Sequence, residues 1–208
     1  MILDVLFIAV IVFLAVVLHE CAHGWVAYKL GDPTAKLAGR LTLNPISHID
    51  PVGTILLPGA LILLQKLGYN TFVLGWAKPV PVDFSRLRNP KRDMIWVAMA
   101  GPLVNILMAV AASFAFKFSL DHGVKEILSF AVFINLLLAV FNMVPIPPLD
   151  GSRLVMGLLP NSLARVYGSA EPYGIFIVMM LLYFGLFARV VLPVILIVGE
   201  WLGISFSV

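Results

Sequence analysis

Two histidines one helical turn apart, with a glutamate beside the first, are the residues of this chain most suited to chemistry. Residues 19–23 read H-E-C-A-H and lie near the end of an apolar run, 3–29. On a helix of about 100° per residue, His19 and His23 fall about 40° apart, on one face. Two imidazoles at this spacing can share one Zn²⁺, and Glu20 can act as a general base.

Composition places this motif in a membrane protein. The 208 residues are 61% hydrophobic and 12% charged, and the mean hydropathy is +1.03, which is far from the usage of soluble domains. Burying Glu20 in a membrane costs about 2.5–3.5 kcal/mol, so we expect it to have a partner or a function. The net charge of +3 comes from loop residues and indicates no nucleic-acid partner. Cys21 is the single cysteine, which excludes an internal disulfide, and we interpret it as a packing residue.

The hydrophobic runs predict an all-α polytopic membrane protein with about 4–5 transmembrane helices. They cover residues 3–29, 53–67, 93–117, 126–145 and 173–204. The second run is short for a span, so we predict a re-entrant or interfacial segment there. The last run is too long for one span, which favours one span followed by a tilted or surface-lying piece. Alternating apolar residues and prolines over 71–83 predict a short β-hairpin at the membrane surface.

The distribution of basic residues predicts which side the motif faces. Nine lysines and arginines lie between Lys29 and Arg92. If residues 52–67 do not cross the membrane, all nine lie on one side, which is then the cytoplasmic side. The same topology puts the ends of the first and fourth runs on that side, with His23 and Asp150 at similar depth. We therefore predict that 52–67 does not cross and that the site lies towards the cytoplasm.

A zinc hydrolase usually has a third protein ligand and one open position. His122 lies on the predicted far side, whereas His48 and Asp50 lie near the correct face. Asp150 is the stronger candidate because it follows three prolines in four residues, which must end the helix, and precedes Gly151. We interpret His48 and Asp50 as loop-fixing residues.

Three motifs in order resemble the site-2 protease family of membrane-embedded zinc metalloproteases. They are H-E-C-A-H, then G-P-L-V-N at 101–105, then N-M-V-P-I-P-P-L-D-G at 142–151. The resemblance covers about residues 5–155 and points to the compact prokaryotic members, which lack PDZ and CBS domains. It implies an intramembrane metalloprotease core over 1–155, with 156–208 as C-terminal membrane helices of the same domain.

The resemblance also implies roles for individual residues. Carried over by motif, His19, His23 and Asp150 are the ligands of one Zn²⁺ per chain, and Glu20 activates water. Asn105 and Asn142 match family asparagines in or near the site. They are candidates for binding substrate or the oxyanion, and a role in holding helices together is compatible with this.

The expected function is an intramembrane zinc endopeptidase of a prokaryotic cell membrane, with the bilayer and transmembrane proteins or peptides as partners. The oligomeric state is left open. Because a helical substrate masks its own carbonyls, we expect it to unwind and to add as a strand to the edge at 71–83. The alternative is a metal-binding scaffold or a metal transporter, but the polar residues gather at one site and do not line a path along several helices.

Overall fold

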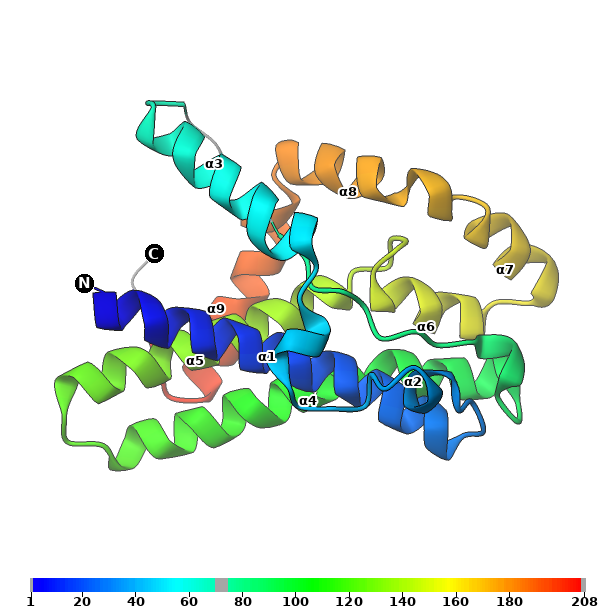
Figure 1. Cartoon of the computed structure of the whole chain (residues 1–208), viewed down its shortest axis with the longest axis horizontal. Helices are drawn as coiled ribbons and strands as arrows, with labels where there is room; N and C mark the ends of the chain where they lie inside the picture. The colour runs from blue at the N-terminus through cyan, green and yellow to red at the C-terminus, as the bar shows by residue number, and fades with distance from the viewer. Residues whose placement is uncertain (1, 70–74, 207–208) are drawn as a thin grey trace.

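The computed structural model describes residues 2–69 and 75–206, with side chains from residue 7 onward, as a bundle of helices (Figure 1). In chain order the α-helices are α1 (Ile2–Lys29), α2 (Thr34–Leu37), α3 (Leu57–Lys66), α4 (Pro90–Phe118), α5 (His122–Asn142), α6 (Asp150–Leu158), α7 (Asn161–Gly168), α8 (Gly174–Tyr183) and α9 (Leu192–Trp201). Shorter 3₁₀ and π segments are η1 (Pro45–His48), η2 (Pro51–Leu56), η3 (Phe84–Arg86), η4 (Glu171–Tyr173) and η5 (Phe187–Val191).

Three long helices, α1, α4 and α5, lie side by side and alternate in direction (Figure 1). The end of α1 therefore lies beside the start of α4, and α5 runs back towards the same end of the bundle (Figure 1). The Arg88 N–H donates to the Leu30 carbonyl over 3.0 Å at this end, which joins the chain entering α4 to the chain leaving α1. Both segments that carry the sequence motifs thus reach the same end of the bundle.

Local sequence explains where α4 and α5 begin. Pro90 occupies the first turn of α4, where a missing N–H costs nothing, and the Asp93 carboxylate accepts the Asn89 N–H over 2.8 Å. Asp121 caps α5 by accepting the Val124 N–H over 2.8 Å. Behind these starts, α4, α5 and α9 share a buried apolar core that includes Ala109, Val132, Leu136 and Ile195.

Four helical stretches are long and apolar enough to span a membrane: Phe7–Lys29, Pro90–Phe118, His122–Asn142 and Asn161–Tyr183. They confirm the predicted all-helical, multi-pass architecture. The fourth begins at Asn161, earlier than the predicted run at 173, because α7 and η4 lead directly into α8. Gly185, with φ of 91°, ends this stretch, and η5 and α9 form the separate C-terminal piece.

The second hydrophobic run forms a short helix that projects away from the long helices (Figure 1). Pro51–Lys66 combines η2 and α3 and is shorter than the four candidate spans. At 1.5 Å per residue its length is about 24 Å, less than the roughly 30 Å hydrocarbon core. A segment that does not cross remains our prediction for it.

No strand occurs among the described residues, so the predicted β-hairpin over 71–83 is not found; residues 71–74 lie outside the described part. Residues 75–83, which we call the strap, run as an irregular segment from the region of α3 towards the start of α4 (Figure 1). Pro79 and Pro81 have no N–H to donate to a ladder. The strap bonds instead to loops and to the side chain of Glu20.

Candidate metal centre

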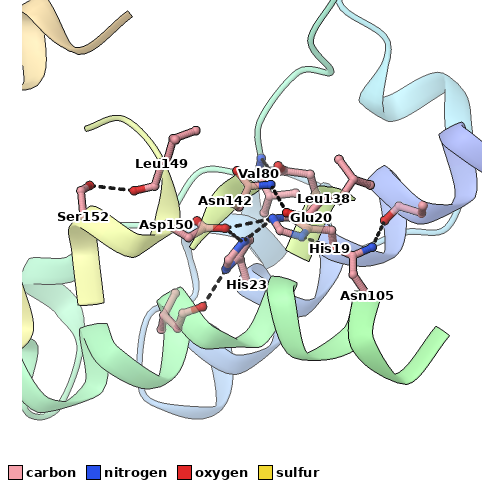
Figure 2. A network of polar contacts seen from close by, with 12 residues as sticks. His19, Glu20, His23, Val80, Asn105, Leu138, Asn142, Leu149, Asp150 and Ser152 are labelled. Carbon is pink, nitrogen blue, oxygen red and sulfur yellow. Dashed lines mark hydrogen bonds and ion pairs between the residues drawn. The ribbon is translucent and has the colours of Figure 1, made fainter. Parts of the chain in front are cut away.

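His19, His23 and Asp150 converge at the end of the bundle where α1, α4 and α6 meet (Figure 2). The two imidazole Nε2 atoms lie 3.0 Å apart. Asp150 Oδ2 lies 3.1 Å from His19 Nε2 and 3.2 Å from His23 Nε2. The histidines are 5% and 8% exposed and the Asp150 side chain 20%, so the two imidazoles are buried and the carboxylate is partly accessible.

The hydrogen bonds on the far side of each imidazole decide which nitrogen carries a proton. His19 Nδ1 lies 2.5 Å from Asn105 Oδ1, and the Asn105 amide nitrogen donates to Ala15 O and Asn135 Oδ1. Because the amide nitrogen is committed to those acceptors, Asn105 presents its oxygen, and His19 must donate from Nδ1. His23 Nδ1 donates to the Val97 carbonyl over 2.6 Å. Both Nε2 atoms therefore point lone pairs at the Asp150 carboxylate.

This donor set fits a zinc ion. Three electron-pair donors face one another, which is repulsive in a low-dielectric site unless a cation lies between them. Tetrahedral zinc with bonds of 2.0–2.1 Å places its ligands about 3.3 Å apart, close to the separations of 3.0–3.2 Å found here. The Nδ1 donors supply the outer hydrogen bonds that typically orient metal-binding histidines.

Gly101 on α4 gives the imidazoles room. A Cβ at this position would lie 2.6 Å from His19 Nε2 and would also overlap His23 Nε2. The missing side chain lets α4 approach α1 closely enough for Val97 and Asn105 to reach their histidines.

A cavity of about 330 Å³ opens beside the three groups. Glu20 and Asn142 line it, as do Val80 of the strap and Arg153 of α6. Asn142 donates to the carbonyl of Leu138 in its own helix, and no hydrogen bond joins it to the histidines or Asp150 among the described residues. The cavity is the place where a peptide could meet both Glu20 and a bound metal ion.

The weaker ligand candidates serve the loops. His48 is fully buried, and its Nε2 donates to the Thr42 carbonyl over 2.8 Å. The Asp50 carboxylate caps η2 by accepting the N–H groups of Val52 and Gly53. Neither residue joins the cluster of His19, His23 and Asp150.

Comparison with known proteins gives this geometry a family. The model of Peptidase family M50 matches residues 7–120 and 117–186. The chain belongs to this family, the site-2 proteases. It is therefore a membrane zinc metalloprotease, a peptide hydrolase with Zn²⁺ as its cofactor.

Individual relatives agree with the family match. The chain is 36% identical to YwhC of Bacillus subtilis, a candidate zinc metalloprotease, over 85% of this chain and 80% of that protein. It is 30% identical to Rip2 of Mycolicibacterium smegmatis, also a candidate zinc metalloprotease, over 79% of this chain and 62% of Rip2. The zinc metalloprotease MJ0392 of Methanocaldococcus jannaschii is 24% identical over 93% of this chain and 47% of that protein. No solved structure matches the chain.

Sequence reasoning missed several contacts around the histidines. Asn135 lies between apolar residues of α5, seven residues before Asn142, and it orients Asn105. Gly101 lies four residues before Asn105, which puts both on one face of α4. Val97 and Val80 contribute through backbone groups, which the residue type does not predict.

Asn105→Ala should weaken zinc binding about 10- to 100-fold, because His19 loses the acceptor that fixes its tautomer. The measurement is a competitive zinc titration of the purified protein against a chelator. Asn142→Ala is the matched control, since its amide bonds only within α5. Equal zinc affinity of Asn105→Ala and wild type would show that His19 needs no orienting partner.

Gly101→Ala should lower zinc affinity to a similar degree, about 10- to 100-fold, because both imidazoles are held at Nδ1 and cannot retreat from the new methyl group. The same titration measures it. Gly59→Ala in α3 is the control, since a Cβ there meets nothing within 4 Å. Unchanged zinc binding in Gly101→Ala would mean that the metal does not lie against this face of α4.

Proposed function

We propose that this protein is an intramembrane endopeptidase in which His19, His23 and Asp150 hold one Zn²⁺ and Glu20 is the general base. The observation that carries the proposal is the meeting of two imidazole Nε2 atoms and a carboxylate oxygen beside a cavity that Glu20 also lines. Two protonated Nδ1 groups leave this set with acceptors only, which is the state that a metal requires.

The chemistry follows from the positions of the chain's own groups. Zn²⁺ supplies a Lewis acid that polarises the scissile carbonyl and makes water a stronger acid. Glu20 takes the proton of the attacking water on its carboxylate and returns it to the nitrogen of the leaving amine. Asn142, at the wall of the cavity, is the candidate for contact with the substrate backbone or the oxyanion. Asn105 uses both ends of its amide on the protein, so we assign it the positioning of His19.

Depth within a span supports membrane-embedded substrates. The candidate span Phe7–Lys29 contains His19 and His23. At 1.5 Å per residue they lie about 15 Å and 9 Å from its Lys29 end. Peptide bonds that reach this depth belong to transmembrane segments or to membrane-inserted peptides, which we propose as the substrate class.

The alternative of a transporter or scaffold lacks support. Transport would need ionisable residues along a path through several helices. The buried side chains of His19, Asn105 and Asn135 are instead bonded to one another beside the metal centre. Membership of a peptidase family also favours hydrolysis.

We further propose that the site lies towards the cytoplasm. The end of α1 lies beside the start of α4 (Figure 1), and the nine basic residues of Lys29–Arg92 belong to the chain that joins these two helices, including their adjoining ends. Such an excess is typical of cytoplasmic loops. This orientation requires that α3 does not cross the membrane.

Glu20→Gln should retain zinc and lower kcat about 10²- to 10⁴-fold, because the amide cannot accept a proton. The measurement pairs zinc content with cleavage of a single-span substrate reconstituted in liposomes. His23→Ala combined with Asp150→Ala is the reference variant and should lose zinc as well. Cleavage that persists in Glu20→Gln would remove Glu20 from the mechanism, and zinc that persists in the reference variant would place the metal elsewhere.

Reporters fused after Gly68 should behave as cytoplasmic, with green fluorescent protein bright and alkaline phosphatase inactive, because a helix of about 24 Å does not cross. Fusions after Leu120, between α4 and α5, are the control and should show the reverse pattern. An active phosphatase at Gly68 would contradict both the non-crossing helix and the proposed orientation.

A further inference from the structure

The strap delivers a backbone donor to the general base. The Val80 N–H points at Glu20 and donates to its Oε2 over 2.8 Å (Figure 2). Val80 is 7% exposed and Glu20 is half-buried, so the bond lies at the wall of the cavity. One carboxylate oxygen of Glu20 is thus held, and the other is left for a reacting group.

The backbone N–H groups of the strap alternate in direction as in a strand, which points the Val80 N–H to the same side as those of Trp76 and Lys78. The N–H groups of Trp76 and Lys78 bond inward, to the carbonyls of Gly53 and His48 over 3.1 and 2.9 Å. Val80 is the next residue in this series. The backbone N–H and C=O groups of residues 77, 79 and 81 then face the opposite, outward edge. Two of these three residues are prolines and have no N–H.

The outward edge is consequently a poor partner for a substrate strand. Between Trp76 and Val82 it offers carbonyl acceptors, but only Ala77 can donate. The predicted addition of the substrate at 71–83 would leave most of the incoming carbonyls without a partner along this stretch. The inward edge, and Val80 in particular, is the edge that serves the site.

Neighbouring groups hold Val80 in place. The buried Arg40 guanidinium donates to the Lys78 carbonyl over 2.7 Å and to the Pro79 carbonyl over 3.4 Å. Gly24 on α1 lets Val80 come close, since a Cβ there would lie 2.7 Å from Val80 Cγ1. Arg40 therefore fixes the strap just before Val80, and the fit against Gly24 seats Val80 itself.

We infer that the backbone N–H of Val80 is a positioning group for catalysis, which holds Glu20 Oε2 so that Oε1 faces the attacking water. The inference rests on the proposed role of Glu20 as general base. A free glutamate side chain samples several rotamers, and misplacing a catalytic group by about 1 Å can cost 10²-fold in rate. The strap, although remote in sequence, thereby becomes part of the machinery that sets kcat.

The test removes this single N–H and leaves the side chain in place. Valine at position 80 is replaced by its α-hydroxy acid through nonsense suppression, which turns the amide into an ester. We expect kcat to fall about 10- to 100-fold, with KM and zinc content within about twofold of wild type. The matched control is the same exchange at Ala77, whose N–H faces outward, and it should leave kcat within about twofold of wild type.

Two outcomes would overturn the inference. An unchanged kcat in the Val80 ester would show that Glu20 needs no donor. A loss that appears in KM or in zinc content would show a role in substrate binding or in folding. Failure of the proposed function is a separate result, because wild-type protein would then show no Glu20-dependent cleavage at all.

Hydrogen exchange tests the contact without relying on activity. The Val80 amide should exchange slowly in wild-type protein and at least about 10-fold faster in Glu20→Ala, which removes its acceptor. The Lys78 amide is the internal control, because its acceptor is the His48 carbonyl in both proteins. Equal exchange of the Val80 amide in the two proteins would refute the hydrogen bond on which the inference stands.

Discussion

Three electron-pair donors held 3.0–3.2 Å apart inside an apolar bundle are the constraint on which the rest of this structure depends. Such a cluster is unfavourable without a cation, since lone pairs and a carboxylate repel one another where the imidazoles are buried. A neutral imidazole already uses its one proton at Nδ1, so relief at Nε2 requires either a second proton, which makes an imidazolium, or a metal cation. The arrangement therefore lowers the stability of the metal-free protein and raises its affinity for a metal ion.

Helix α4 imposes this protonation state through one stripe of its surface. Val97, Gly101 and Asn105 recur every four residues, so they lie along the same side of the helix. The first accepts from His23, the second leaves space, and the third accepts from His19. Asn135 on α5 continues the series by fixing which way the Asn105 amide points. A polar network within the bundle thus has every donor paired with an acceptor, as low-dielectric surroundings demand.

The sequence predicted those features that depend on the type and spacing of side chains. The helical spacing of H-E-x-x-H identifies His19 and His23 as a pair of ligands. Asp150 is recognisable as an acidic residue at a point where prolines end a helix. Both could therefore be predicted from the sequence. The start of the fourth span at Asn161 could not, because α7 carries polar residues that interrupt the hydrophobic run although the helical stretch continues. The β-hairpin is not found over the described part of 71–83 for a related reason. Alternation of apolar residues predicts an extended chain but does not supply a pairing partner.

The strap shows why a backbone group can be the better device at such a site. An N–H of the main chain has no side-chain torsions to order, and it is fixed as soon as its neighbours are fixed. The prolines on either side of Val80 further restrict the backbone dihedral angles of the strap and remove competing N–H donors. Any residue except proline could supply this N–H, so selection would act on the flanking prolines, on Arg40 and on Gly24. Packing alone therefore determines which side chain stands at residue 80, while the backbone N–H of that residue binds Glu20.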